Sequence, residues 1–488
     1  MLAAIVAAIV PLLWPPVAPL TDLPGHIGAF RIMTDAHRAP LSNYYAVHWT
    51  LIGNLGVDAL VLALRPLLGL ETATKLVVMA IPALSVAAML WAAQEAHGRL
   101  PASAAFAFTL AYAAPFQLGF VNFALSSALA LAGLAGWLHL ARDRAAWVRA
   151  AVFVPLACLV WLCHAFGWAM LGLFVFGAEW VIRCREGRSS WRAAALAAAM
   201  CLPMALPLLA TLTGLATAAR GDTGDWFDFA VKLIWIVSLL RERWQFYDIL
   251  SVAVLLTLLA VAARSPHFRF EPLLGVPAAL GTIAFLALPR IFQGGAYVDM
   301  RILPCVVALA VLAIRRKDGD DAPLAFAAVG FFALRLATTA IAFALIWAGQ
   351  ARALRALPAL PVGSRVLVLV NETAKTDWAN PRLTHIAGLA IARRRIFTNE
   401  QWSIAGQQLI TPISEDAAPF DRDPSQIVYP SNAGYQITDF DQAIGSFDRR
   451  GFGYVWTIGF PSGRAHATDL RPIWSDGESA VYRVANPA

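Results

Sequence analysis

The chain has 488 residues, of which 59% are hydrophobic and only 14% are charged, whereas soluble domains average roughly 45–50% apolar and about 25% charged residues. This composition excludes a soluble enzyme and predicts a polytopic membrane protein, because several uncharged runs approach the roughly 20 residues that cross a bilayer. The net charge of +7 does not indicate nucleic-acid binding, since many Lys and Arg residues stand in short loops between apolar runs, where they orient a membrane protein.

The distribution of charge between the apolar runs predicts a topology. Residues 1–18 lack the basic start and the small-residue cleavage site of a signal peptide, so we interpret them as a retained first span. The apolar run at residues 57–64 is too short to cross unaided. If residues 55–68 lie along the interface and residues 150–182 turn back near His164, thirteen Lys and Arg residues fall in short loops on one side, which is then cytoplasmic. The predicted fold is an α-helical polytopic membrane protein with about eleven spans, near residues 1–18, 72–94, 102–116, 119–141, 150–163, 165–182, 193–212, 247–263, 272–289, 302–314 and 322–349.

The remainder of the chain has a different composition. Residues 350–488 contain 27 charged residues among 139, against 42 among 349 in residues 1–349. Residues 366–370, 453–458 and 480–484 have the pattern of strands, and residues 381–394 have that of a helix. We therefore expect a transmembrane domain at residues 1–349, with a long first outer loop at residues 19–71, and a C-terminal mixed α/β soluble domain at residues 350–488.

The first outer loop opens with Leu20-Thr-Asp-Leu-Pro-Gly-His-Ile-Gly-Ala-Phe-Arg31. Asp22 and His26 are four residues apart, so a helix that begins here would place both on one face, at the level of the lipid headgroups. The alternative is that Thr21 or Asp22 only caps this helix and that Pro24 fills its first turn. The residues alone leave both interpretations open.

Three short motifs follow one another in this loop, namely Asp22-x-Pro24-x-His26, Tyr44-Tyr45-x-Val47-x-Trp49 and Asn54-Leu55-x-x-Asp58. Together with the span count and the outer α/β domain, they are similar to a group of bacterial membrane proteins with the architecture of the GT-C superfamily, the membrane glycosyltransferases that use polyprenyl-phosphate sugars. The resemblance implies a bacterial inner membrane. The distribution of Lys and Arg predicts a cytoplasmic amino terminus and, after eleven crossings, a periplasmic C-terminal domain. The chain departs from the best known members because Asp22 is not part of an Asp-x-Asp or Glu-x-Asp pair. No metal ligands and no cofactor are therefore assigned, and metal use stays open.

The chemistry of such a transfer assigns roles to the loop residues. When an acceptor hydroxyl attacks the anomeric carbon opposite the lipid phosphate, a carboxylate within hydrogen-bond reach can take the hydroxyl proton. Asp22 is the candidate general base. His26 would orient Asp22 or share the proton, since imidazole titrates near neutral pH, although an interfacial histidine with a purely structural role is an equal alternative.

The leaving lipid phosphate gains charge and needs fixed cations, preferably Arg, whose fork matches phosphate oxygens. The candidates are Arg301, in the outer segment 293–301, and Arg241 and Arg243, in the amphipathic stretch 226–247. Asp299 and Tyr297, beside Arg301, are candidate substrate-binding residues. The alternatives are a local ion pair at the membrane edge and, for residues 226–247, anchoring in the headgroup layer.

Two further polar residues stand at predicted outer turns. His164 and Asn122 are candidate substrate-binding residues, because ionisable groups among spans are functional candidates and an amide can hydrogen-bond a sugar. A structural role is the alternative for His164. Arg335, inside the last span, must pair or face a cavity, since an unpaired Arg costs at least about 3 kcal/mol there.

The leading hypothesis is an inverting membrane glycosyltransferase that moves a hexosyl or pentosyl group from a polyprenyl-phosphate carrier to a glycan, lipid or protein acceptor of the cell envelope. Its partners would be that lipid-linked sugar, the acceptor and membrane lipids, without nucleic acid. One alternative is a transporter or flippase of a lipid-linked substrate, and another is a noncatalytic membrane assembly factor. No nucleotide-binding motif is visible, which fits a donor carried by lipid.

Overall fold

The computed structural model describes residues 1–217, 221–371, 378–430 and 438–485. The chain forms two compact units. The first, which we call the helical unit, comprises residues 1–13, 51–60 and 76–341, and the second, the mixed unit, comprises residues 14–50, 61–75 and 342–488.

Each predicted span coincides with helical structure among the described residues. The helices are α1 (Leu2–Ala7), α4 (Leu70–His97), α5 (Ala104–Phe108), α6 (Ala114–Leu118), α7 (Val121–Asp143), α8 (Ala146–Cys163), α9 (Ala165–Arg185), α10 (Ser190–Cys201), α11 (Leu206–Leu212), α13 (Gln245–Arg264), α14 (Pro272–Ala287), α15 (Val298–Ala313) and α16 (Ala322–Ala353). Helix α12 (Phe229–Val237) and a two-stranded sheet of β2 (Phe268–Phe270) and β3 (Ile314–Arg316) lie in loops between them. The polytopic helical fold is thus confirmed.

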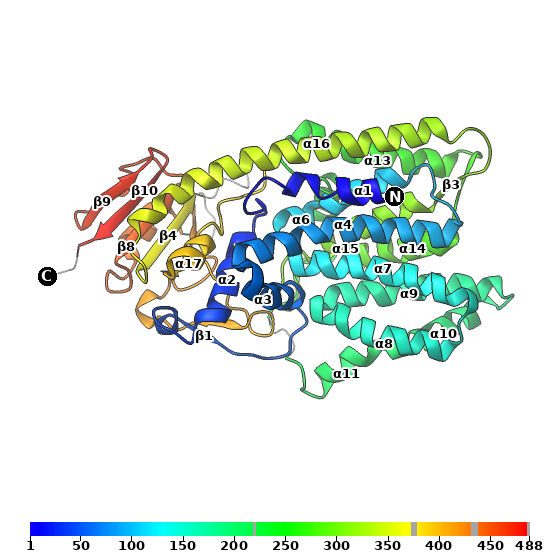
Figure 1. Ribbon diagram of the computed structural model, residues 1–488, viewed down its shortest axis with the longest axis horizontal. Helices are drawn as coiled ribbons and strands as arrows, with labels where there is room; N and C mark the ends of the chain where they lie inside the picture. The colour runs from blue at the N-terminus through cyan, green and yellow to red at the C-terminus, as the bar shows by residue number, and fades with distance from the viewer. Residues whose placement is uncertain (218–220, 372–377, 431–437, 486–488) are drawn as a thin grey trace. The chain divides into compact units, whose positions relative to one another are not determined.

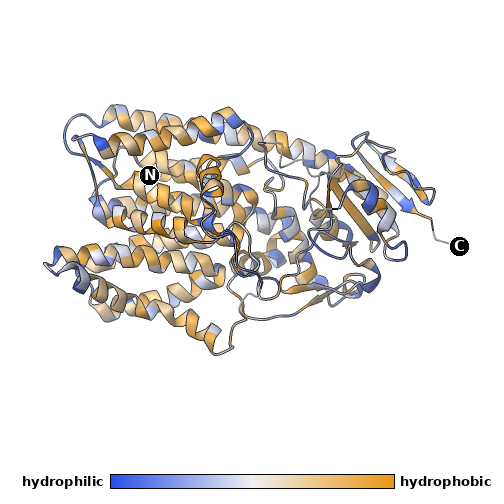
Figure 2. Ribbon diagram, turned by 180° about the vertical axis from the view of Figure 1, so that it is seen from behind, coloured by the Kyte–Doolittle hydropathy of each residue, from blue (hydrophilic) through white to orange (hydrophobic). Residues whose placement is uncertain are grey.

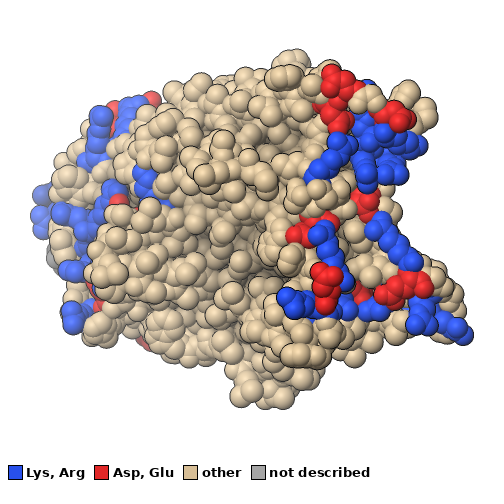
Figure 3. All heavy atoms as spheres, turned by 45° about the vertical axis from the view of Figure 1, so that its right-hand side comes forward, with Lys and Arg blue, Asp and Glu red and all other residues tan. Residues whose placement is uncertain are grey.

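Length and hydropathy separate the long spans from the short ones. Seven helical segments of the described chain, α4, α7, α8, α9, α10 with α11, α13 and α16, are long and apolar enough to cross a membrane. The α1, α5–α6 and α14 segments are apolar but shorter. Apolar residues dominate these helices and polar residues gather near their ends in Figure 2. On the face drawn in Figure 3, charged side chains gather toward the margins and leave a broad uncharged surface, as expected for a multi-pass membrane protein.

The helical unit is organised around adjacent helices that carry small residues at their contacts. Helix α14 packs against α9 and α15, and α9 packs against α7 (Figure 1). Gly167, in the first turn of α9, lies so close to α7 that a Cβ there would be 2.0 Å from the Ser126 hydroxyl oxygen. This close approach fixes the start of α9, where His164 stands.

The predicted interfacial segment forms helix α3 (Gly56–Leu68), which has 13 residues. At about 1.5 Å per residue it is roughly 20 Å long, shorter than the ~30 Å hydrocarbon core. This length agrees with the expectation that the segment does not cross unaided.

The mixed unit contains a six-stranded sheet with the order β5-β4-β8-β10-β9, in which β7 also pairs with β4. The strands are β4 (Arg365–Asn371), β5 (Phe397–Thr398), β7 (Ile427–Val428), β8 (Tyr454–Ile458), β9 (Leu470–Ser475) and β10 (Ser479–Val484). β4 is parallel to β5, β7 and β8, whereas β10 is antiparallel to β8 and β9. The predicted mixed α/β character is confirmed, and the apolar run Val366–Val370 is buried, as in strands covered on both faces.

Segments from both ends of the chain complete this unit. Helices α2 (Leu23–Asp35), α17 (Gly388–Arg394) and α18 (Phe440–Ser446) belong to it, and β1 (Tyr45–Val47) pairs antiparallel with β6 (Ile410–Pro412). The helix predicted at residues 381–394 is confirmed only from Gly388 onward. Residues 381–387 are not helical, because the Arg382 carbonyl accepts a hydrogen bond from the Gln350 side chain at 2.7 Å and the Arg382 guanidinium donates to the Pro19 carbonyl at 2.9 Å.

Candidate functional site

Asp22 stands at the start of α2 in the mixed unit. It occupies the position before the first helical residue, and Pro24 lies in the first turn, as the sequence predicts. The Asp22 side chain makes no capping hydrogen bond, so the capping interpretation is not supported. The side chain is 19% exposed, and its Oδ1 lies 3.9 Å from Nε2 of His385. Asp22 therefore retains access from outside while a second ionisable group stands behind it.

His385 lies within ion-pair range of three carboxylates. Its Nδ1 contacts Oε2 of Glu400 at 3.1 Å, and its Nε2 lies 3.8 Å from Oδ1 of Asp423 and 3.9 Å from Asp22. Burial by itself lowers the pKa of His385, but the hydrogen bond to Glu400 and the charges of Asp423 and Asp22 outweigh it and raise this pKa to about 9. His385 is therefore a buried imidazolium at neutral pH.

The surroundings of the imidazolium fix its position. Its ring packs on Trp402, with 4.4 Å between the ring centroids. Glu400 is fully buried, and its other oxygen accepts a hydrogen bond from Gln401, which also donates to the Gly25 carbonyl at 3.0 Å. Asp423 accepts from Gln426 at 2.7 Å. We call Asp22, His385, Glu400 and Asp423 the Asp22 cluster.

A close crossing of α2 and α17 brings Asp22 to His385. A Cβ built on Gly388 would lie 2.1 Å from the Pro24 carbonyl oxygen, and one on Gly28 would lie 2.9 Å from the Cα of Gly388. Only glycine permits two backbones to approach so closely. The crossing sets the amino-terminal end of α2 beside the segment that precedes α17.

His26, the histidine predicted to assist Asp22, occupies a different environment. Its ring packs against Trp402 at 5.1 Å and Phe30 at 6.2 Å between centroids. Burial, with a smaller contribution from the charge of His385, lowers the pKa of His26 to about 4. The neutral His26 packs between the rings of Trp402 and Phe30, whereas the charged His385 lies next to Asp22.

A polar run in the sequence marks one part of the Asp22 cluster. Asn399, Glu400 and Gln401 form a polar run directly after β5, and all three are buried. Buried polar residues at the carboxyl end of a parallel strand are a common feature of binding sites. No comparable local sequence pattern indicates that His385 belongs to the cluster.

The helical unit contains the predicted cation Arg301. It lies in the first turn of α15, where Nη1 is 3.1 Å from Nε2 of His164 and Nη2 donates to the Ala296 carbonyl at 3.1 Å. Its guanidinium lies over the ring of Phe120, 4.5 Å from the centroid. Two residues selected separately from the sequence are thus brought into contact.

Arg301 also lines an apolar cavity of about 50 Å³ in the helical unit. Residues of α4, α6, α7 and α15 form its wall, among them Ile81, Met89, Phe116, Phe123 and Leu131. A guanidinium at the edge of an apolar cavity suits an amphiphile with an anionic head. We call Arg301, His164 and Phe120 the Arg301 cluster.

Asn122 is placed away from any free surface. Its side-chain oxygen accepts from the Val57 amide at 2.6 Å, and its amide nitrogen donates to Asp58 at 2.7 Å and to the Asn54 carbonyl at 3.1 Å. The residue is 3% exposed. Both donors are used to hold the start of α3, so the prediction that Asn122 hydrogen-bonds a sugar is not supported.

Asp299 is likewise committed to the protein interior. Its Oδ2 lies 3.1 Å from Nζ of Lys232, which also donates to the carbonyls of Phe285 and Leu288 at 2.8 and 2.9 Å. Both side chains are nearly inaccessible. Asp299 is thus in an ion pair, as the alternative interpretation expects, but its partner is the buried Lys232 and not a neighbouring residue of its own segment.

Of the other predicted residues, Tyr297, Arg241 and Arg243 lie in loops of the helical unit, and Arg335 lies in α16. Tyr297 precedes α15 with a left-handed backbone (φ 60°), is 40% exposed, and packs edge-on against Trp235. Arg241 is half-buried and Arg243 is exposed, both between α12 and α13. Arg335 is paired as expected, with its guanidinium 2.9 Å from Asp248. Among the described residues, no group of three His, Cys, Asp or Glu side chains is arranged to hold a metal ion.

Solved structures provide the comparison for this architecture. The chain is similar to ArnT from Cupriavidus metallidurans in the apo state, with a TM-score of 0.51 and 14% identity over 100% of this chain and 98% of that chain. The same protein bound to undecaprenyl phosphate gives a TM-score of 0.52 at 13% identity over the same shares. The arabinofuranosyltransferase AftD from Mycobacteria is covered over 41% of its length, with 14% identity and a TM-score of 0.38. No protein-family model and no curated protein matches the sequence.

These observations define a multi-pass membrane protein whose helical unit is joined to a mixed α/β unit. The similarity to ArnT extends over the whole chain and shows that the chain has the fold of ArnT.

Proposed function

We propose that the protein is an inverting glycosyltransferase that moves a monosaccharide from a polyprenyl-phosphate donor to an acceptor of the bacterial envelope, on the periplasmic side of the inner membrane. The observation that carries the proposal is the partly exposed Asp22 carboxylate backed by the buried His385 imidazolium. The fold adds support, because ArnT, to which the chain is similar, has been solved with undecaprenyl phosphate bound.

Asp22 is the proposed general base. It accepts the proton of the acceptor hydroxyl as that oxygen bonds to the anomeric carbon, and the bond from this carbon to the lipid phosphate oxygen breaks. His385 does not touch the substrate in this scheme. Its positive charge, 3.9 Å from Oδ1 of Asp22, stabilises the carboxylate that must accept the proton, so His385 is a positioning residue.

Arg301 is the proposed ligand of the donor phosphate. The bonding electrons leave with the lipid phosphate, whose negative charge increases in the transition state, and a fixed guanidinium stabilises this charge. The apolar cavity beside Arg301 suits the first part of a prenyl chain. Arg241, Arg243 and Tyr297 remain predicted contributors, whereas Asn122 and Asp299 are left out because their polar atoms are bound within the protein.

The test uses the full-length protein purified in detergent, with a radiolabelled polyprenyl-phosphate sugar and an envelope extract as the acceptor source. Asp22→Asn should abolish transfer and leave expression and elution profile unchanged. Asp416→Asn, at a carboxylate with a 59% exposed side chain in the same unit, is the matched control and should transfer normally. Normal transfer by Asp22→Asn would refute the role of this residue.

Detergent also separates catalysis from transport. Transfer of the sugar survives loss of the two compartments, whereas movement of a lipid-linked substrate across a membrane cannot be scored without them. Wild-type protein that produces no glycosylated acceptor in detergent, but moves lipid-linked sugar across proteoliposomes, would favour the transporter alternative.

A further inference from the structure

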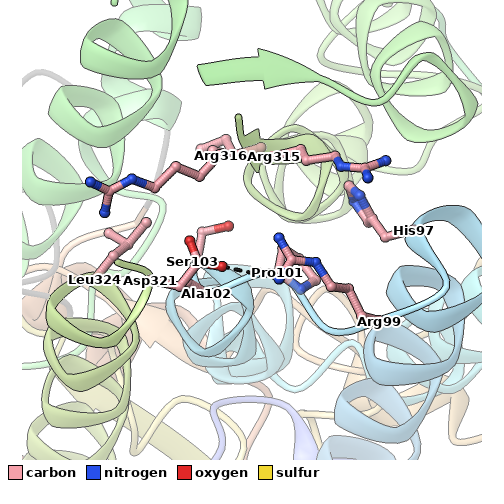
Figure 4. A pocket seen from close by; sticks show the side chains of 10 residues that line it. His97, Arg99, Pro101, Ala102, Ser103, Arg315, Arg316, Asp321 and Leu324 are labelled. Carbon is pink, nitrogen blue, oxygen red and sulfur yellow. Dashed lines mark ion pairs between the residues drawn. The ribbon is translucent and has the colours of Figure 1, made fainter. Parts of the chain in front are cut away.

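A second polar pocket lies in the helical unit, at the end where the predicted cytoplasmic loops meet. Here α4 ends at His97, α5 begins at Ala104, α15 ends at Ala313 and α16 begins at Ala322. Its polar lining comes from His97, Arg99, Ser103, Arg315, Arg316 and Asp321 (Figure 4). We call it the Arg99–Arg315 pocket. The proposed glycosyltransferase chemistry does not use it.

Positive charge is concentrated in this pocket beyond what the protein neutralises. Arg99 pairs with Asp321 at 3.2 Å, and Arg316 donates to the Asp318 carbonyl at 2.7 Å and to the Asp320 carbonyl. Arg315 is half-buried and has no carboxylate partner within the described ranges. In Figure 4 the Arg315 side chain extends toward His97, the Arg99 guanidinium faces Asp321, and Arg316 extends the other way.

The strand pairing adds a further cation beside Arg315. In the antiparallel pair of β2 and β3, Arg269 is the direct partner of Arg315. Residues directly opposite in such a pair lie on the same face, and like charges there are destabilising. The pocket lining thus holds three guanidinium groups, from Arg99, Arg315 and Arg316, and one carboxylate, Asp321, while Arg269 stands beside Arg315 on the neighbouring strand. A bound anion would relieve this repulsion.

Hydrogen-bonding capacity is also left over inside the pocket. Nε2 of His97 contacts the Leu312 carbonyl at 2.8 Å, so this nitrogen carries the hydrogen. The other ring nitrogen, Nδ1, is buried and has no hydrogen-bond partner among the described residues. In the neutral ring Nδ1 can only accept a hydrogen bond, so its partner would be a water or a headgroup hydroxyl and not a phosphate oxygen.

The size of the pocket restricts what can enter. Its enclosed part is about 10 Å³, which is close to the space of a single water-sized oxygen. One oxygen of a larger anion therefore fits inside, and the remainder of the anion stays at the open mouth. A tetrahedral phosphate meets this requirement, and the pocket lies where the spans end, at the level of lipid headgroups.

We propose that the Arg99–Arg315 pocket binds the phosphate group of an anionic phospholipid of the surrounding membrane. Basic pockets between the ends of transmembrane helices bind such headgroups. The guanidinium groups of Arg99 and Arg315 contact the phosphate oxygens, and the bound lipid links the ends of α4, α5, α15 and α16. Inorganic phosphate shares the chemistry and is the other source of the ligand.

Native mass spectrometry of the full-length protein in detergent tests this proposal, with phosphatidylglycerol as the probe and phosphatidylcholine of the same chains as the reference. The wild type should retain phosphatidylglycerol in preference to phosphatidylcholine. Arg99→Gln and Arg315→Gln should each lower its apparent affinity by about fivefold or more. Arg188→Gln, at an exposed arginine of another predicted cytoplasmic loop, is the matched control and should bind as the wild type does.

Two further measurements are needed. The first identifies the source of the phosphate, and the second uses a substitute variant in case Arg315→Gln misfolds. Inorganic phosphate that displaces phosphatidylglycerol from the wild type shows that the phosphate group itself is recognised. Phosphate binding that depends on Arg99 without any phosphatidylglycerol binding supports the pocket with a soluble ligand. If Arg315→Gln does not elute as a single species, Arg315→Lys replaces it, and an intermediate affinity is expected. Equal phosphatidylglycerol retention by wild type and both glutamine variants, or an equal loss in Arg188→Gln, would overturn the proposal.

Discussion

Nε2 of His385 lies 3.9 Å from Oδ1 of Asp22, although the two residues stand near opposite ends of the sequence. The same imidazole bonds to the fully buried Glu400 at 3.1 Å. A fixed positive charge thus stands behind the only acidic residue of the Asp-x-Pro-x-His motif. Within the mixed unit, electrostatics as well as packing therefore couple the start of α2 to the segment that precedes α17.

Stability should depend on pH through His385. Its pKa is about 9 in the folded protein against 6.5 for the free side chain, so its contribution is complete below pH 6.5 and is lost as the pH rises toward 9. The loss is at most about 3 kcal/mol. The melting temperature of the purified protein should fall between pH 6.5 and 9, and this fall should be much smaller in His385→Gln. His466→Gln, at an exposed histidine of the same unit, should keep the wild-type slope. A steep fall that persists in His385→Gln would assign the effect to other groups.

The crossing of α2 and α17 should be sensitive to a single methyl group. Gly388→Ala places a Cβ only 2.1 Å from the Pro24 carbonyl oxygen, which is far shorter than a van der Waals contact. Overpacking of this kind typically costs about 1–3 kcal/mol, so both the melting temperature and the transfer rate should fall. Gly445→Ala, near the end of the exposed face of α18, meets no atom within 4 Å and should raise stability slightly, by about 0.4–1 kcal/mol. Equal stability of the two variants would show that α2 and α17 are not held this closely.

Much of the architecture follows from local sequence patterns. The uncharged apolar runs predict the helical spans, and short runs rich in β-branched and aromatic residues predict β4, β8 and β10. Strand β9 is missed because Pro472 interrupts its pattern. Proline is tolerated there because β9 is at the edge of the sheet.

The candidate site could be predicted only in part. Asp22 and Arg301 stand out because charged residues are rare beside apolar segments, and the contact between Arg301 and His164 joins two such residues. His385 and Asp423 could not be assigned, since their role depends on a crossing of helices that no local pattern encodes. The partner of Asp299 could not be predicted, because Lys232 lies in a different helix that is far away in the sequence.

Arg301 should contribute to donor recognition through hydrogen bonds to the charged phosphate of the donor. A hydrogen bond to a charged group is worth about 1.5–3 kcal/mol, so Arg301→Gln should lower kcat/KM for the lipid-linked donor by about ten- to a hundredfold. Arg301→Lys keeps the charge but loses the fork, and its activity should fall between the two. Arg264→Gln, at the exposed end of α13, serves as the control and should leave kcat/KM unchanged. An unaltered kcat/KM in Arg301→Gln would remove this residue from the site.

The buried pair of Lys232 and Asp299 should act on stability and not on substrate binding. Lys232→Met leaves the Asp299 carboxylate buried without its cation, and breaking such a pair costs about 3–5 kcal/mol. The melting temperature of the purified protein should drop sharply. The double variant Lys232→Met with Asp299→Asn removes both charges and should recover most of the loss, since the amide at position 299 can still accept from the Met300 backbone, whose N–H bonds to Asp299 at 2.9 Å.

Kinetics of the double variant then separate the two roles that the sequence left open for Asp299. An ion pair with a purely structural role predicts a recovered melting temperature together with a wild-type KM for the donor. A carboxylate that binds substrate predicts a raised KM even where stability is restored, because the amide carries no charge. We expect the first outcome, since both side chains are at most 3% exposed and Lys232 already contributes two further hydrogen bonds to the carbonyls that end α14.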